Sequence, residues 1–327
     1  MMKDEIWNYI IKRFSNAETD ASRQALDEWI AASPDHKQLY DEAVTLWMLA
    51  EKLPREAAEP VFENNVRQFR PKRLYIRFAA ACAGLLVVFA ALLLKQKHEQ
   101  KNIVWVSHSA SRGKMLSVTL PDSTTVMLNS GSTITYSNNF DYDNTRLIKL
   151  TGEAFFKVTH RKKQPFVVQT RMLKTVVLGT SFNVRAYINE PEIGVAVATG
   201  KVGVVADVRQ QSNQPVFLLP NMRLAYNVNS GKYHTDSSFP GMAGEWQKGI
   251  LTFEQTPVLD ALQTISRRFN VQFDTAAYKH TACRLTAKFN NQNLHSILST
   301  LKAAMNVQIR QTNNIIYIKG GTAYNQP

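Results

Sequence analysis

The feature that most constrains this chain is an apolar segment without a single charged residue, residues 78–94 (FAAACAGLLVVFAALLL). As a helix, its 17 residues would extend about 26 Å, slightly less than the roughly 30 Å hydrocarbon core of a bilayer. Basic residues flank the segment on both sides: Arg67, Arg70, Lys72, Arg73 and Arg77 before it, and Lys95, Lys97 and Lys101 after it. A buried core helix is the alternative, but a core helix would rarely be bracketed by so many cations. The segment therefore predicts one transmembrane helix over residues 76–96, with soluble parts on both sides of a membrane.

Charge is distributed unevenly along the 327 residues, so the formal net charge of +13 is misleading as an average. Residues 1–63 carry 7 Lys/Arg against 13 Asp/Glu, residues 64–77 carry 5 basic and no acidic residues, and residues 78–327 carry 27 basic against 13 acidic residues. Because cations supply most of the affinity for a phosphate backbone, we predict no direct binding of nucleic acid by the acidic N-terminal region. The basic cluster before the span instead indicates a contact with anionic lipids. Basic residues are almost equally frequent on the two sides of the span, so charge alone leaves the orientation open.

Three amphipathic helices are predicted before the span, over residues 3–15, 20–32 and 34–53. The pair Ser33-Pro34 predicts the start of the third helix, because serine can cap and proline loses nothing at the first helical position. A bundle of this size is near the lower limit for independent stability and gains from a partner that covers its apolar surface. Trp29 and Trp47 are candidate anchors for such a partner, and the alternative for each is an ordinary core position.

After the span, the period of the apolar residues changes from 3.6 to 2, which predicts strands. The predicted strands are rich in β-branched and aromatic residues, and they cover residues 116–120, 124–129, 133–137, 146–152, 153–160, 166–170, 174–179, 182–187, 193–200, 202–206, 216–220 and 222–228. This series predicts an all-β, sandwich-like domain over residues 103–230.

From residue 245 the pattern mixes strands and helices. Strands are predicted at 249–255, 271–274 and 284–289, helices at 257–269 and 293–305, and a final hairpin around residues 312–314. Two β-α-β halves of this kind predict a small α+β domain over residues 245–319. The predicted fold class is therefore multi-domain: a small all-α N-terminal bundle, one transmembrane helix, an all-β domain and a C-terminal α+β domain.

The sequence offers little for catalysis. The seven histidines are scattered without metal-ligand spacing, and no nucleophile elbow or phosphate-binding glycine loop occurs. Glu153 is the one carboxylate set among aromatic residues, and pairing with Arg146 or Arg185 explains it better than a catalytic role. We predict no catalytic residue, no metal and no cofactor, and hence a protein that is not an enzyme.

The β region resembles the extracytoplasmic domain of FecR-type anti-sigma regulators. The resemblance rests on the order and spacing of LPDSTTVMLNSGSTITY (120–136), LTGEAFFKVTHRKKQPFVV (150–168), VVLGTSFNVRAY (176–187), ATGKVGV (198–204) and LLPNMRLAYN (218–227). Residues 18–47 are similar to the short cytoplasmic helical domain of that family, and the last 75 or so residues to its appended module, which is akin to secretin/TonB N-terminal domains. The chain departs from the family pattern at Ser123 and Asn221, where glycine is usual.

The resemblance implies a membrane-bound anti-sigma factor with its N-terminus in the cytoplasm and its C-terminus in the periplasm, anchored in the inner membrane. The helical domain, residues 1–70, would bind an extracytoplasmic-function sigma factor. The periplasmic part would receive a signal from the signalling domain of a TonB-dependent outer-membrane receptor and so control the transcription of uptake genes. The candidate sigma-binding side chains are Leu26, Trp29, Ile30, Leu39, Tyr40 and Trp47. The alternative function is an inner-membrane-anchored periplasmic adaptor that binds a receptor or envelope component without sigma-factor control.

One peptide bond, Gly179-Thr180, is a candidate for self-cleavage. A threonine hydroxyl can attack the preceding carbonyl if that peptide is held strained, and a preceding glycine offers the least hindrance. A cut of this kind would give a single-span protein an irreversible signal. The alternative is an ordinary strand end with a glycine in a turn.

Overall fold

The computed structural model describes residues 9–10, 12–13, 18–51, 103–141, 143–206, 215–237, 243–278 and 283–320. The predicted membrane helix, 76–96, lies outside the described residues, as does most of the predicted helix 3–15. Among the described residues, no helix combines the length and the apolar character needed to cross a bilayer. The described residues form a small helical head before residue 52, a β domain from Trp105 to Asp236, and a C-terminal α+β module from Glu245 to Gly320.

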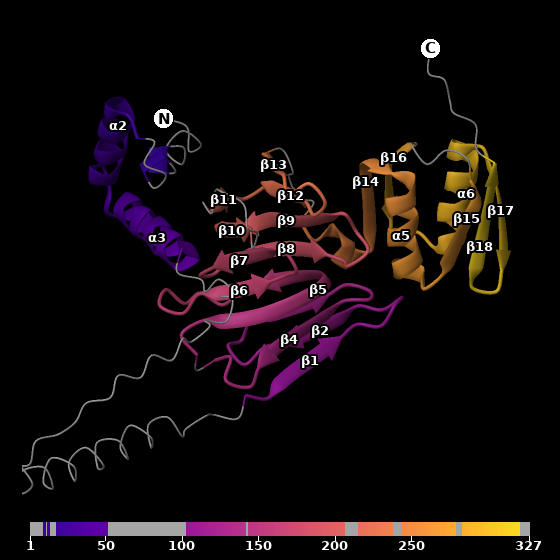
Figure 1. Ribbon diagram of the computed structural model, residues 1–327, viewed down its shortest axis with the longest axis horizontal. Coiled ribbons are helices and arrows are strands. Elements are labelled where there is room, and N and C mark those ends of the chain that lie inside the picture. The colour runs from indigo at the N-terminus through magenta and orange to yellow at the C-terminus, as the bar shows by residue number, and fades with distance from the viewer. Residues whose placement is uncertain are drawn as a thin grey trace, which may run out of the picture. The chain divides into compact units, whose positions relative to one another are not determined.

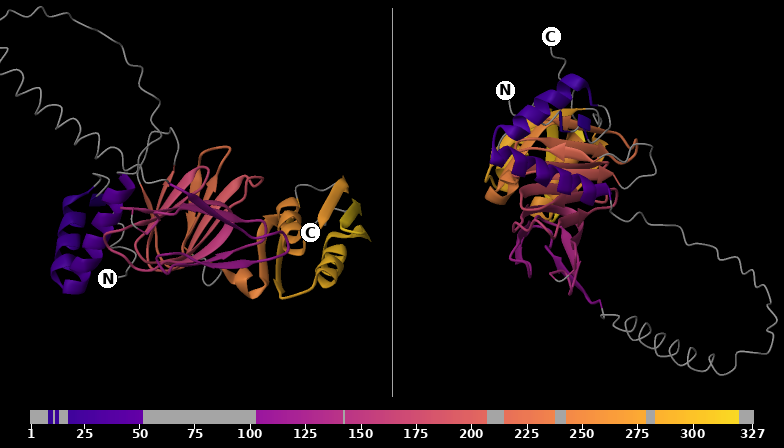
Figure 2. Two further views of the ribbon diagram at one scale, coloured as in Figure 1. Left: turned by 90° about the horizontal axis from the view of Figure 1, so that it is seen from below. Right: turned by 90° about the vertical axis from the view of Figure 1, so that its left-hand side faces the viewer.

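The head contains helices α2 (Asp20–Ala31) and α3 (Pro34–Glu51), which pack against each other (Figure 2). Thr19 caps α2 through a capping box with Ser22, which the sequence analysis did not identify. The predicted start of α3 is confirmed, since Ser33 Oγ accepts a hydrogen bond from the Asp35 amide at 3.2 Å. The fully buried apolar core of the described head is small and consists of Ile10, Leu26 and Ala43.

The β domain is built from thirteen strands (Figure 1). They are β1 (Trp105–Ser109), β2 (Leu116–Thr119), β3 (Thr125–Leu128), β4 (Thr133–Ser137), β5 (Arg146–Lys157), β6 (Phe166–Gln169), β7 (Leu173–Val177), β8 (Ser181–Ala186), β9 (Glu192–Thr199), β10 (Val202–Ala206), β11 (Val216–Leu218), β12 (Arg223–Asn227) and β13 (Tyr233–Asp236). They form two sheets with the orders β1-β4-β5-β6-β7-β10-β11 and β2-β3-β5-β8-β9-β12-β13. The long strand β5 belongs to both sheets.

Strand β5 changes sheets at Gly152. Its first half pairs with β4 and β6, and its second half, from Gly152 to Lys157, pairs with β3 and β8. Gly152 has φ +101°, and a β-carbon there would lie 2.4 Å from Ser132 Oγ and 2.7 Å from Ser132 Cα. The prediction of two separate strands, 146–152 and 153–160, was wrong, because the glycine bends one continuous strand instead of ending it.

The core of the β domain lies between the two sheets. Phe156 of β5 and Phe182 of β8 are fully buried, with stacked rings whose centroids are 5.1 Å apart. Two strands, β1 and β13, were not predicted. Every residue of β13 is exposed, so the alternation of apolar and polar residues that marks a half-buried strand is missing there.

The C-terminal module has its own apolar core. After a 3₁₀ helix, η1 (Glu245–Lys248), it runs through β14 (Ile250–Pro257), α5 (Val258–Phe269), β15 (Gln272–Tyr278), β16 (Arg284–Asn290), α6 (Leu294–Met305), β17 (Val307–Thr312) and β18 (Ile315–Gly320). Strands β14 and β16 pair antiparallel, while β18 pairs parallel with β15 and antiparallel with β17. Helix α5 contacts strands of both small sheets (Figure 1). The predicted order of strands and helices in this module is confirmed.

The two departures from the family pattern both adopt the left-handed backbone conformation that glycine favours. Ser123 and Asn221 each have φ 67°. Asparagine tolerates this conformation better than serine does, so Ser123 carries the larger strain. Both turns keep the shape that the usual glycine would give them.

The corner at Gly152 generates a first prediction. Gly152→Ala should destabilise the β domain by about 3 kcal/mol, because the new methyl group meets Ser132 and the backbone must hold a positive φ. Thermal or urea unfolding of the purified chain measures this change. Gly203→Ala is the matched control, since a β-carbon at Gly203 meets its nearest neighbour, Phe217, at an ordinary 3.5 Å. Equal stability of the two variants would contradict the structural role of the corner.

Candidate functional site

The predicted sigma-binding side chains occupy different environments in the head. Leu26 is fully buried in the small core, whereas Trp29, Ile30 and Tyr40 pack around that core and are partly buried. Leu39 is half-buried on α3. Trp47 lies on α3, but its side chain is outside the described residues. Leu26 thus supports the head from inside, while the partly buried residues retain surface for a partner, and their role in binding stays a prediction.

Trp29 is held in place by a neighbouring histidine. Its ring stacks on that of His36, with centroids 4.3 Å apart and planes 8° from parallel. The Trp29 carbonyl oxygen also lies 2.8 Å from His36 Nδ1. The stack joins the end of α2 to the start of α3 and fixes the orientation of the indole on the head.

The Gly179-Thr180 bond lies in the short connection between β7 and β8. A β-carbon on Gly179 would be 2.5 Å from His160 Nδ1 and 2.6 Å from His160 Cα, so only glycine permits this close packing. Thr180 is 4% exposed, and its hydroxyl donates a hydrogen bond to the Lys201 carbonyl oxygen at 2.9 Å. The bond is therefore enclosed rather than in a free turn, and self-cleavage stays a prediction.

Two arginine–carboxylate groups, whose carboxylates are buried, organise the polar interior of the β domain. Arg146 is fully buried and pairs with Asp122, the aspartate of the first family motif, at 2.7 Å. Glu153, directly after the Gly152 corner, is 5% exposed and accepts from Asn129, Asn183 and Arg185 at 2.8, 2.9 and 3.1 Å. The predicted pairing of Glu153 with Arg185 is confirmed. The other predicted pairing, with Arg146, is wrong, because Arg146 pairs with Asp122 instead.

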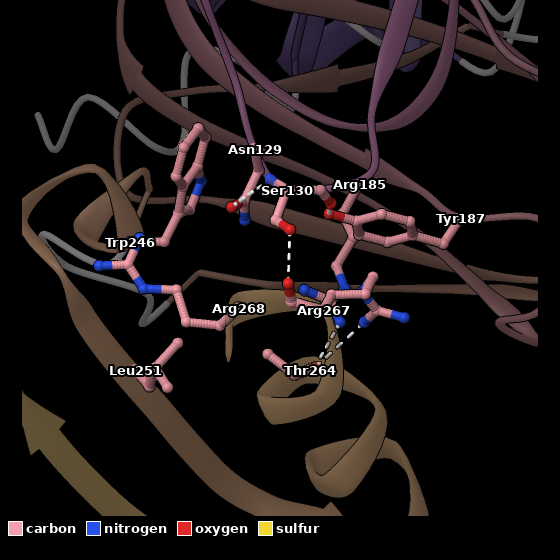
Figure 3. Close-up of a pocket in the computed structure, with 9 residues that line it drawn as sticks. All are labelled: Asn129, Ser130, Arg185, Tyr187, Trp246, Leu251, Thr264, Arg267 and Arg268. Atoms are coloured by element: carbon pink, nitrogen blue, oxygen red, sulfur yellow. Dashed lines mark hydrogen bonds between the residues drawn. The ribbon is translucent and has the colours of Figure 1, made fainter. Parts of the chain in front are cut away.

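The second group extends into a cluster that sequence analysis missed. Arg185 donates to both carboxylate oxygens of Glu190 at 2.8 Å, and Arg267 of α5 also pairs with Glu190. The Arg267 guanidinium lies 3.9 Å from the centre of the Tyr187 ring. We name Glu153, Arg185, Tyr187, Glu190 and Arg267 the polar cluster. Residues of the β domain and of the C-terminal module meet in it (Figure 3).

Burial and charge shape the electrostatics of the polar cluster. Burial opposes the charged form of Arg185, but Glu190 and Glu153 more than offset it, so the pKa of Arg185 is raised. Burial, followed by the like charge of Arg185, lowers the pKa of Arg267. Burial, followed by the carboxylate of Glu153, raises the pKa of Tyr187 to about 12. The phenol is thus neutral at physiological pH, and it donates to the Ser130 carbonyl oxygen at 2.9 Å.

Beside the polar cluster is a cavity of about 10 Å³, close to the minimum that holds one water molecule. Figure 3 shows its lining, which includes Asn129, Ser130, Trp246 and Arg268. This space is too small for a substrate or cofactor. Among the residues that the structure describes, no group of three or more His, Cys, Asp or Glu side chains could hold a metal ion. The polar cluster is therefore suited to joining surfaces rather than to binding a small molecule.

Comparisons with known proteins place the β domain and the C-terminal module in one family. The family description "FecR protein" matches residues 107–203, and "FecR, C-terminal" matches residues 250–318. A crystal structure of a candidate anti-sigma factor from Parabacteroides distasonis is 28% identical, with a TM-score of 0.61, and covers 67% of this chain and 100% of that chain. A second such structure from the same organism is 29% identical, with a TM-score of 0.60, and covers 66% of this chain and 100% of that chain. No curated protein matches the chain.

These similarities place the chain in a class of regulatory proteins. That class is not a known class of enzyme. The chain belongs to the FecR family of anti-sigma factors. The resemblance seen in the sequence motifs is thereby confirmed. An anti-sigma role implies a sigma factor as partner.

The environment of Thr180 leads to a second prediction. If the Gly179-Thr180 bond cleaves itself, the purified chain incubated without protease yields two fragments that separate between these residues. Thr180→Ala should abolish the cut because it removes the attacking hydroxyl, whereas Thr180→Ser, which keeps a hydroxyl, should still be cut. Intact-mass measurement distinguishes these outcomes. A single uncut mass over days, in the wild type as well as in both variants, would make Gly179 simply a close-packing residue.

Proposed function

We propose that this anti-sigma factor is a single-pass inner-membrane protein whose head, residues 1–70, binds an extracytoplasmic-function sigma factor in the cytoplasm. Its β domain and C-terminal module lie in the periplasm and respond to the signalling domain of a TonB-dependent outer-membrane receptor. The output is the transcription of uptake genes. The observation that carries the proposal is the membership of the FecR family together with an acidic head whose described helices bury only a small apolar core.

The head has the physical character of a domain completed by a partner. In its described residues only three apolar side chains, Ile10, Leu26 and Ala43, form the fully buried core. Helical domains this small bury little surface alone, so a partner that covers the partly buried Trp29, Ile30 and Tyr40 adds stability by mass action. Met48 is 52% exposed and extends the apolar surface along α3.

Charge supports the same partner. Acidic residues outnumber basic ones in residues 1–63 by 13 to 7, and some, such as Asp20 and Asp27, are well exposed. The surfaces by which a sigma factor faces DNA are expected to be basic, so an acidic head complements them. Electrostatic complementarity of this kind speeds association and favours the correct partner.

The apolar segment 78–94 supports the membrane anchor, and the family resemblance supports its orientation. A chain crossing once at 76–96 would leave both FecR-matching regions on one side and the head on the other. The adaptor function remains the alternative if the head captures no sigma factor.

The third prediction tests capture by the head. Trp29→Ala in the tagged full chain should reduce the co-purified sigma factor about thirtyfold, because a large aromatic side chain at an interface is worth ~2 kcal/mol or more. Mass spectrometry of the purified complex quantifies the sigma factor against the chain. Gln24→Ala, an exposed substitution on the same helix, is the control and should leave capture unchanged.

Protein level must be measured beside capture, because Trp29 also packs on the small core. A parallel loss of the chain itself would assign Trp29 to folding rather than to binding. If the wild-type chain captures no sigma factor, the proposed function is wrong and the adaptor function takes its place.

The fourth prediction concerns the orientation in the membrane. A reporter that is active only outside the cytoplasm should be active when fused after Gly320 and silent when fused at Pro60. Leu86→Arg should impair insertion, since a cation at mid-span costs about 2.5–3.5 kcal/mol on insertion scales. Leu86→Ile is the control and should insert normally. The reverse pattern of reporter activity would overturn the proposed localisation.

A further inference from the structure

The β domain and the C-terminal module are joined by polar groups rather than by a common apolar core. The buried apolar residues of the β domain form a large cluster between Ala110 and Tyr226 and a small one of Val167, Val176 and Leu178. Those of the module form a cluster of their own between Leu251 and Ile318. In the described part of the chain, none of these clusters includes residues of both domains. Each domain can therefore keep its core if the contact between them opens.

Arg267 is the residue of the module that makes most of this contact. Its carbonyl oxygen, in the last turn of α5, accepts from the Gly113 amide at 2.9 Å and from Ser130 Oγ at 2.5 Å. The last carbonyls of a helix have no partner within the helix, so the β domain here caps α5. The Arg267 side chain pairs with Glu190 and lies over Tyr187.

Other contacts surround Arg267. Arg185 donates to Thr264 Oγ1 at 2.9 Å, and Arg112 donates to Ser266 Oγ at 3.1 Å. The Trp246 indole donates to Asn183 Oδ1 at 2.9 Å, and Asn183 in turn donates to Glu153. A continuous hydrogen-bonded path thus leads from the module to Glu153, beside the Gly152 corner.

A contact of this composition is specific in geometry but modest in net stability. Removing charges from water costs free energy that their mutual attraction only partly returns, and the surrounding hydrogen bonds must supply the rest. Such contacts fix one arrangement of two bodies, and they can be released when a partner competes for the charges.

We propose that the polar cluster is a latch between the β domain and the C-terminal module, and that its opening is the step by which binding of a partner to the module changes the rest of the chain. This signalling role rests on the proposed function, whereas the latch itself does not. The module moves as a unit with its core intact, and the β domain responds through Glu190, Arg185 and Glu153.

Arg267→Met in the full-length protein opens the latch selectively. Methionine keeps part of the apolar stem, and Glu190 retains Arg185 as its partner, so no buried charge is left alone. Arg268→Met is the matched control: it lies on the same helix, and the described part of the chain shows no hydrogen bond or ion pair for its side chain. Far-UV circular dichroism verifies that both variants stay folded.

Ser130→Cys supplies the readout, because Ser130 is 2% exposed and lies against the Arg267 carbonyl. In this background, the rate at which iodoacetamide alkylates Cys at position 130 is quantified by peptide mass. Arg267→Met should raise this rate about tenfold or more, and a tenfold change corresponds to ~1.4 kcal/mol in the free energy of opening. With Arg268→Met the rate should remain within about twofold of the background. An unchanged rate with Arg267→Met would overturn the latch.

A reporter of sigma-dependent transcription, measured without any inducer, tests the signalling role. Arg267→Met in the otherwise wild-type chain should raise its output, and Arg268→Met should not. Faster alkylation with unchanged output would overturn the signalling role. The alkylation measurement involves no sigma factor, so its result does not depend on the proposed function. If the wild-type chain captures no sigma factor, the proposed function is contradicted, but the conclusion on the latch is unchanged.

Discussion

The architecture depends on one strand that belongs to two sheets. Strand β5 can do so because Gly152 adopts φ +101° and lies against Ser132 without a side chain. The two halves of β5 thereby direct β4 and β6 into one sheet and β3 and β8 into the other. Across the core, Phe156 in the second half of β5 meets Phe166 of β6, which belongs to the other sheet, with ring centroids 5.9 Å apart.

The corner also explains where the polar interior begins. Glu153 follows Gly152 and is buried, so its charge requires partners. Asn129 and Asn183 supply hydrogen bonds, and Arg185 supplies the opposite charge. Arg185 then needs its second carboxylate, Glu190, which in turn binds Arg267 of the module. The buried carboxylate of Glu153 is thus the start of a chain of hydrogen bonds and ion pairs, and the last member of that chain, Arg267, belongs to the C-terminal module.

Much of this fold could be predicted from the sequence, because most strands of the β domain are rich in β-branched and aromatic residues and are separated by turn residues. Strand β13 could not, since both of its faces are exposed. The corner was missed because Gly152, between Thr151 and Glu153, resembles a turn residue, and only the pairing with neighbouring strands shows that the strand continues. The pairing of Glu153 with Arg185 was predicted from residue type alone. The contact of Glu190 with Arg267 spans 77 residues and two domains, and neither residue carries a local signal of its partner.

The three described parts differ in how they are stabilised, and this difference fits a regulator. The β domain and the C-terminal module each contain a large core, so their mutual arrangement can change while both remain folded. The head buries only three apolar side chains fully in its described residues, so its stability depends more strongly on whatever covers it. A sigma factor that covers the apolar surface of the head would stabilise the head only while it is bound. A partner bound to the module would act on the contact between the module and the β domain, which consists of charged groups that can separate. Under the proposed function, both ends of the chain therefore respond to the binding of a partner, and the β domain lies between them in the sequence.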